Sequence, residues 1–440
     1  MGRDKIYQKD WRYNLLKPWV DVNIRHSYRK CQIHGEENIP TDGAVLLAPN
    51  HCNTLMDALV MLRAYKKPTV FGARADIFNK RLIAEFMTFA RILPMVRQRD
   101  GLRNVLKNKG TQETIVETLE NNVRFCMYPE GTHRARHSLQ VLGKGVFRAA
   151  LAANEKFGAE KPIYIVPVGI EYGDYFRYRS TSLVNYGKPI NVTEMIAGLG
   201  LDNEAQIMDA LRKELSARMT ELFTYFKFDE NYDEKWALTK MVAIRDRKKG
   251  YGECGTDLYE DMMLNRSIAA DIEKAMEEHP EEMAEILAEV KEFEKGRKKS
   301  GISIYAFKKK SSPVMQAVGK GLAALLGLPY FIFSAVATLP MWAASFFIRS
   351  KVRDKAFRNT VSFGVKLAMT TIFLPIITVL AFVFAPWWIA LAIIALWLPA
   401  YSYFHDYIEG CRRWISDIRL LRERKLWKKF KGIVKEYKKL

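Results

Sequence analysis

The sequence predicts an α/β domain with a mostly parallel sheet flanked by helices, followed by a helical segment and a C-terminal membrane-embedded helical region. Short apolar runs of strand length alternate with helical patterns over residues 31–200. Apolar residues then recur at helical spacing over 201–310, and long uncharged runs occupy 311–410. An interfacial N-terminal segment, 1–30, and a basic amphipathic tail, 411–440, complete the expected organisation.

The α/β prediction depends on four apolar runs with the length and the turn-type flanks of strands: Ala44–Ala48, Thr69–Phe71, Val123–Tyr128 and Ile163–Ile170. Helical patterns lie between them, as over Leu82–Ala90 and Gly145–Ala153. Such alternation favours a parallel sheet with helices on its faces. Further along, one helix is predicted after Asp202/Asn203 as caps, and another over about Glu281–Glu294.

The membrane prediction depends on two uncharged, mostly apolar runs, Gly321–Ile348 and Leu367–Phe404. Both are longer than the ~20 residues that a spanning helix needs. The longer run is about twice a single span, and Pro386 near its middle predicts a helical hairpin. In the shorter run, Pro329 and Pro340 either kink one long helix or form a re-entrant hairpin.

Basic residues flank these runs on all sides, and the positive-inside rule places such flanks in the cytoplasm. This favours two hairpins over three crossings. We therefore expect an integral membrane protein whose α/β domain lies on the cytoplasmic face of the cytoplasmic membrane.

The charge balance indicates a polyanionic partner, because 69 Lys+Arg against 49 Asp+Glu give a net charge of +20 on 440 residues. Nucleic acid, an anionic membrane and phosphorylated substrates all fit that excess. The tail from Arg412 to Leu440 carries aromatic residues at helical spacing among many lysines, which predicts an interfacial helix on anionic lipids or, alternatively, a solvated charged helix. Since the sequence shows no nucleic-acid-binding signature, we expect anionic membrane lipids as partners and no nucleic acid.

The first candidate for chemistry is the segment from Asn50 to Asp57, which follows an apolar strand and precedes an apolar helix. His51 on the loop and Asp57 in the next helix could form a general-base pair, in which the carboxylate fixes the tautomer of the imidazole. The alternative is structural: Thr54 to Asp57 also fits a capping box, and His51 could be an ordinary loop histidine.

The second candidate is the turn after the strand that ends near Tyr128. Gly131, Thr132, Arg134 and Arg136 supply flexible backbone, a hydroxyl and guanidinium groups that suit a phosphate. A surface turn with solvated arginines is the alternative. No metal site is expected, because the nearby histidines, His133 and His137, lack a third ligand.

Two further segments complete the set. Arg97 and Arg99 follow the apolar run Ile92–Val96 and could bind a second phosphate oxygen. Val166–Gly169 lies in an apolar strand with an internal proline, and it belongs more often to a core than to a site.

In order and spacing these four segments resemble the blocks of the glycerolphosphate acyltransferase superfamily, most closely its lysophosphatidate acyltransferase branch, over about residues 30–195. Asn50-His51 to Asp57 is similar to the first block and Pro94-Met95-Val96-Arg97 to the second. Tyr128-Pro129-Glu130-Gly131-Thr132 resembles the third, usually Phe-Pro-Glu-Gly-Thr-Arg, and Val166–Gly169 the fourth. The chain departs from the family twice: five residues separate His51 from Asp57 instead of four, and His133 stands where the family has arginine.

The resemblance implies that His51 deprotonates an acceptor hydroxyl, which attacks the thioester of acyl-CoA or acyl-carrier protein without an acyl-enzyme. Asp57 would hold His51, and the acceptor phosphate would be bound by Arg97, Glu130, Gly131, Thr132 and Arg134. The expected acceptor is 1-acyl-glycerol-3-phosphate, with glycerol-3-phosphate or another lysolipid as the alternative. No cofactor is implied, and a non-catalytic, membrane-anchored basic scaffold is the rival from another class.

Overall fold

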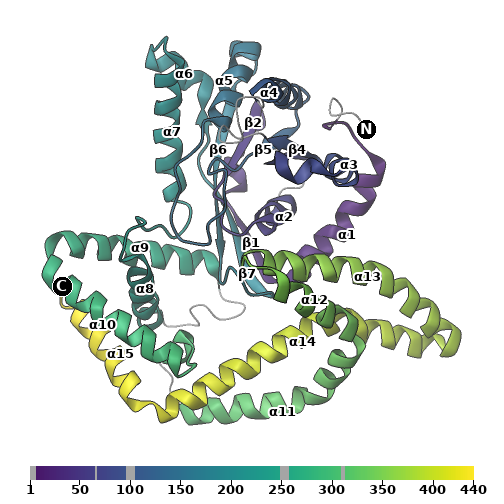
Figure 1. Cartoon of the computed structure of the whole chain (residues 1–440), viewed down its shortest axis with the longest axis vertical. Coiled ribbons are helices and arrows are strands. Elements are labelled where there is room, and N and C mark those ends of the chain that lie inside the picture. Colours follow the sequence, from purple (N-terminus) through teal and green to yellow (C-terminus); the bar gives the residue numbers. More distant parts are fainter. Residues whose placement is uncertain (1–5, 65–66, 96–104, 248–256, 309–312) are drawn as a thin grey trace. The chain divides into compact units, whose positions relative to one another are not determined.

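The computed structural model describes residues 6–64, 67–95, 105–247, 257–308 and 313–440 (Figure 1). The chain divides into two compact units. The first comprises Met1–Arg25, Cys31–Tyr175 and Ser182–Tyr225, and the second comprises His26–Lys30, Phe176–Thr181 and Phe226–Leu440. The α/β unit thus extends past the boundary at 200 that the sequence suggested.

Within the described residues the first unit is built on an eight-stranded sheet in the order β1-β7-β6-β2-β5-β3-β4, with β8 beside β6. β2 is parallel to β5 and β6, β3 is parallel to β4 and β5, and only β7 and β8 run antiparallel to β6. This confirms the mostly parallel sheet. The strands are β1 (Tyr28–His34), β2 (Ala44–Pro49), β3 (Thr69–Arg74), β4 (Ile92–Met95), β5 (Arg124–Cys126), β6 (Ile163–Tyr172), β7 (Ser180–Tyr186) and β8 (Ile190–Asn191).

The helices α5 and α7 each bury one side against this sheet. Phe147 of α5 and Leu211 and Leu215 of α7 are fully buried in the same core as the strands. Because α7 packs on this core, it belongs to the α/β unit and not to the helical segment that follows. The helices that begin in this unit are α1 (Trp11–Ser27), α2 (Leu55–Ala64), α3 (Arg81–Phe89), α4 (Val105–Glu120), α5 (Gly145–Phe157), α6 (Val192–Leu199) and α7 (Glu204–Thr220).

The second unit contains a bundle made of α8 (Tyr232–Asp246), α9 (Leu258–Glu278), α10 (Pro280–Lys299), the short helix η7 (Ile304–Phe307) and α15 (Arg424–Tyr437). The interpretation of the tail as a helix with its aromatic face in the bilayer is wrong for α15. Phe430 is fully buried, with its ring 4.9 Å from that of Phe307 and 5.9 Å from that of Phe293. The apolar face of α15 is therefore covered by the protein itself.

The remaining helices of this unit form the predicted membrane region: α11 (Pro313–Ala337), α12 (Leu339–Lys351), α13 (Phe357–Phe384) and α14 (Trp387–Arg422). Among the described residues, α11, α13 and α14 are long and apolar enough to span a membrane. The chain is thus a membrane protein. The break between α13 and α14 falls at Ala385 and Pro386, where the sequence predicts a turn, and the shorter run divides at Thr338.

Candidate active site

Three adjacent strands bring the chemically interesting loops to one edge of the sheet. β5, β2 and β6 are parallel neighbours, with Leu46 of β2 beside Phe125 of β5 and Ile165 of β6. The carboxyl ends of parallel strands lie at the same edge, where open α/β sheets bind their ligands. His51 follows β2, Glu130 follows β5 and Tyr172 ends β6, so their side chains meet there.

His51 and Asp57 are in direct contact. Nδ1 of His51 lies 2.7 Å from Oδ2 of Asp57; the aspartate side chain is fully buried, whereas the histidine side chain is 18% exposed. A buried carboxylate holds the proton of the imidazole on Nδ1 and leaves the lone pair of Nε2 for a substrate. The pair therefore has the chemistry of a general base, His51, that is oriented by a carboxylate, Asp57.

The carboxylate of Asp57 also organises the loop in front of α2. Its Oδ2 accepts the backbone N–H groups of Cys52 at 2.8 Å and Asn53 at 2.7 Å, and its Oδ1 accepts the hydroxyl of Tyr172 at 2.8 Å. These are loop amides that precede the helix, so Asp57 does more than cap α2. Thr54 adopts a positive φ of 49°, and this turn lets the chain return to Asp57 across the unusually long spacing.

The loop after β5 is joined to the histidine loop by Glu130. Its Oε1 accepts the backbone N–H of His51 at 2.7 Å, and its Oε2 accepts that of Gln140 at 3.0 Å. Burial raises the pKa of Glu130, while these two hydrogen bonds favour its charged form. Glu130 therefore connects the two loops through its carboxylate, which offers a phosphate no hydrogen-bond donor.

The donors near His51 come from the next residues. The backbone N–H of Arg134 donates to the carbonyl of His51 at 3.0 Å, and its guanidinium donates to Oγ of Ser138 at 2.9 Å. The Thr132 hydroxyl bonds to the amide oxygen of Gln140 at 3.2 Å. Gly131 has a φ of +66°, a conformation that favours glycine in this tight turn.

The other residues predicted from the sequence have different outcomes. Arg97 and Arg99 lie outside the described residues. His133 stands edge-on to His51, with ring centroids 5.7 Å apart, and His137 pairs with Glu171 at 3.1 Å in the interior. The fourth block is part of buried β6, where a Cβ on Gly169 would lie 2.3 Å from the carbonyl oxygen of Leu222. This glycine is thus required for packing.

Sequence reasoning missed two residues at the site, Tyr172 and Gln140. It placed Tyr128 in the third block but gave no role to its ring, whose centroid lies 4.4 Å from that of His51. Gln140 was detectable only as a polar residue shortly after the turn. Tyr172 gave no signal, because its bond to Asp57 depends on which strands are neighbours.

The family model described as Acyltransferase matches residues 30–171, which include the histidine loop and the glutamate loop. This part of the chain is an acyltransferase domain. The match bears out the expected resemblance at the level of an acyltransferase, and the chain is an enzyme of the acyl-transfer class.

Among solved structures, the acyltransferase domain is similar to the crystal structure of the 1-acyl-sn-glycerophosphate (LPA) acyltransferase PlsC from Thermotoga maritima. The match has 15% sequence identity and a TM-score of 0.35, and it covers 50% of this chain and 86% of that chain. Among curated proteins, none matches the chain significantly.

Proposed function

We propose that this enzyme transfers an acyl group from the thioester of acyl-CoA or acyl-carrier protein to the free hydroxyl of 1-acyl-glycerol-3-phosphate, giving phosphatidate for phospholipid synthesis. The observation that carries the proposal is the contact of 2.7 Å between His51 and Asp57 at the carboxyl edge of the acyltransferase domain. The preference for a lysophosphatidate acceptor follows from the motif resemblance and from the membrane helices of the chain.

In the proposed mechanism, Nε2 of His51 removes the proton of the acceptor hydroxyl as its oxygen attacks the thioester carbonyl. The acyl C–S bond then breaks, and the thiolate of the carrier leaves and takes up a proton. Asp57 holds the imidazole and stabilises its positive charge during the attack. General-base assistance of this type contributes roughly 10²–10⁴-fold to the rate.

Direct transfer fits the state of the cysteine beside the histidine. Cys52 is 2% exposed, and burial raises the pKa of its thiol well above the usual value, with the Asp57 carboxylate adding to the shift. A buried, protonated thiol is a poor nucleophile. Its position therefore supports attack by the acceptor hydroxyl without an acyl-enzyme on Cys52.

The acceptor phosphate is assigned to the turn beside His51. The guanidinium of Arg134 is charged at every physiological pH and presents paired donors that match phosphate oxygens. Thr132 and Gly131 lie next to it, and their hydroxyl and backbone N–H, which donate to Gln140 and Tyr128, would exchange these partners for the phosphate. The imidazole of His133 is a weaker choice, since it presents at most two donors, whereas a guanidinium presents a fork of five.

The membrane helices supply the setting for an amphiphilic acceptor. Basic residues at the ends of the apolar runs support a cytoplasmic location of these flanks, and we propose that the acyltransferase domain works at the cytoplasmic face of the cytoplasmic membrane. No cofactor is expected to take part in the reaction.

The test is an acyl-transfer assay of the purified full chain with labelled acyl donors and a panel of phosphorylated acceptors. Lysophosphatidate is expected to give the highest kcat/KM. A preference for glycerol-3-phosphate or for a zwitterionic lysolipid would replace the proposed acceptor by the alternative one.

His51→Ala in the same assay is expected to lower kcat by roughly 10²–10⁴-fold. The control is His34→Ala on the edge strand β1, which β7 and β6 separate from β2, and this variant should leave the rate unchanged. Activity of His51→Ala within a few fold of wild type would rule out the general-base role.

A further inference from the structure

A pocket of about 420 Å³ lies in the second unit, lined by α11, α14 and the short helix η7. Small side chains on these elements leave the space open: Ala306, Ala323, Ala324 and Gly410. Pockets of a few hundred Å³ suit a small molecule or the headgroup of an amphiphile.

Contacts between α11 and α14 show where the pocket lies along the two helices. Lys320 bonds to Asp417 at 2.6 Å, and the hydroxyl of Tyr407 donates to the carbonyl of Ala324 at 2.8 Å. Residue numbers thus rise on α11 as they fall on α14, so the helices are antiparallel. Lys320 directly precedes the uncharged run of α11, and His405 directly follows that of α14. The pocket therefore lies at the border between apolar and charged surface, the depth of lipid headgroups.

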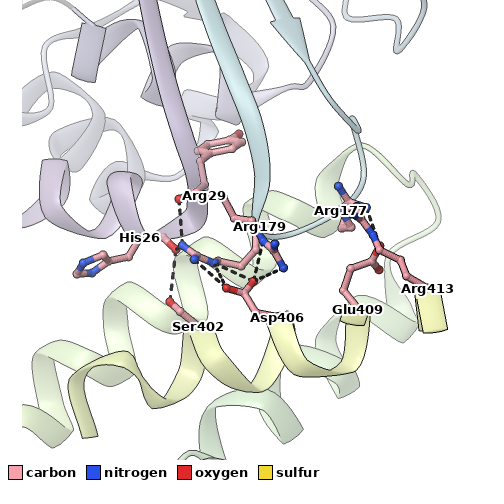
Figure 2. Close-up of polar contacts among 9 residues, drawn as sticks. His26, Arg29, Arg177, Arg179, Ser402, Asp406, Glu409 and Arg413 are labelled. Carbon is pink, nitrogen blue, oxygen red and sulfur yellow. Dashed lines mark hydrogen bonds and ion pairs between the residues drawn. The ribbon is translucent and has the colours of Figure 1, made fainter. Parts of the chain in front are cut away.

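Ion pairs fix the charged groups beside the pocket (Figure 2). Arg29 and Arg179 both bind Asp406, at 3.1 Å and 2.9 Å. Arg177 binds the next carboxylate along α14, Glu409, at 2.8 Å. Two cations thus share one carboxylate at Asp406.

Arg413 repeats this arrangement one turn further along the helix. Its Nε donates at 3.0 Å to the same Glu409 oxygen that Arg177 contacts. Together with the Lys320–Asp417 pair, five cationic side chains meet three carboxylates in this network. The network as a whole carries an excess of two positive charges, and Lys320 and Arg413 line the pocket together with Asp406 and Asp417.

We propose that this pocket binds the phosphate of an anionic glycerophospholipid from the surrounding bilayer, a function that goes beyond acyl transfer. Basic pockets between membrane helices on the cytoplasmic side bind anionic headgroups. Lys320 and Arg413 donate to the phosphate oxygens, and the lipid's negative charge offsets the excess of the network. The acyl chains extend into the bilayer beside the uncharged run of α11, which begins at Gly321 directly after Lys320.

The test uses the full chain, purified and depleted of lipid, and measures binding of phosphatidylglycerol, phosphatidylethanolamine and diacylglycerol by native mass spectrometry. On the wild type, phosphatidylglycerol is expected to bind saturably and at least tenfold more tightly than either other lipid. Equal binding of phosphatidylethanolamine would overturn the charge argument, and equal binding of diacylglycerol would overturn the phosphate site.

A matched pair of variants locates the site. A Cβ at Gly410 or at Gly364 meets no atom within 4 Å, both glycines lie inside helices, and only Gly410 lines the pocket. Gly410→Trp fills the pocket and should weaken phosphatidylglycerol binding at least tenfold, whereas Gly364→Trp on α13 should bind like the wild type. Equal affinity of the two variants would show that the lipid does not bind in this pocket. Because acyl transfer is not the readout, this result is independent of the proposed function.

Discussion

Asp57 shows how one buried charge is made tolerable and useful at the same time. A fully buried carboxylate is costly unless its oxygens are occupied by donors. Here two loop amides, the imidazole of His51 and the hydroxyl of Tyr172 occupy them. Each donor that satisfies the carboxylate also fixes its position, so the histidine is oriented by the same contacts that stabilise the buried charge.

Tyr172→Phe removes one donor without creating a cavity at Asp57. We expect kcat to fall about tenfold, in line with a lost hydrogen bond to a charged group of ~1.5 kcal/mol, and acceptor KM to stay constant.

Tyr164→Phe is the control, because it makes the same change at the other end of β6, where the hydroxyl contacts Asp42. It should leave kcat unchanged. If both variants behave alike, Tyr172 is a structural residue only.

Arg134→Ala addresses the phosphate assignment. The backbone bond from residue 134 to His51 survives the substitution, so the loss is confined to the guanidinium. We expect acceptor KM to rise tenfold or more, in line with ~1.5–3 kcal/mol for a charge-assisted hydrogen bond, with donor KM unchanged. An unchanged acceptor KM would assign the phosphate to His133 or Arg97 instead.

At the scale of elements, α15 shows that an amphipathic pattern does not specify what covers its apolar face. Bilayer and helical bundle both accept aromatic residues at helical spacing. In this chain Lys429 and Lys438 of α15 pair with Glu292 of α10 and Asp246 of α8. Phe430 of the same helix is fully buried in the core of the bundle. Part of the positive charge of the tail is thus paired within the protein.

Phe430→Ala should lower the opening free energy of α15 by about 3–5 kcal/mol, the usual cost of deleting a buried phenylalanine side chain. Hydrogen exchange of the α15 amides measures this energy directly. Lys428→Ala on the exposed face of the same helix should stay within about 0.5 kcal/mol. A helix whose aromatic face lay in lipid would show weaker liposome binding in Phe430→Ala and little change in exchange.

The success of the element predictions depended on the kind of pattern. Strands buried on both faces, such as β2 and β6, appear as continuous apolar runs, and the cap at Asn203 accepts from two amides of α7. β1 and β7 have polar sequences, YRKCQIH and STSLVNY. They were missed because pairing with neighbouring strands places them in the sheet, and no apolar run in their sequences indicates a strand. His51 and Asp57 are close in sequence and were predicted; Tyr172 comes from another strand and could not be.

At the scale of the molecule, the net charge of +20 has several separate roles. Some cations, such as Lys429 and Lys438 of α15, pair with carboxylates of α10 and α8, and others, such as Arg179, pair with carboxylates of α14. Others flank the apolar helices, where anionic lipid attracts them. The excess is therefore distributed over the surfaces of a membrane enzyme, and no nucleic-acid partner is needed to explain it.

The length of α14 has a mechanical consequence. Its 36 residues span about 54 Å, whereas the apolar core of a bilayer is only about 30 Å thick. The half from His405 onward therefore continues beyond that core as a rigid rod, and Ser416 near its end binds the backbone of Ser303 at 2.7 Å. A tilt of about 10° in response to bilayer thickness would swing that end by about 5 Å. A change in bilayer thickness that tilts α14 would therefore also displace the segment leading to η7.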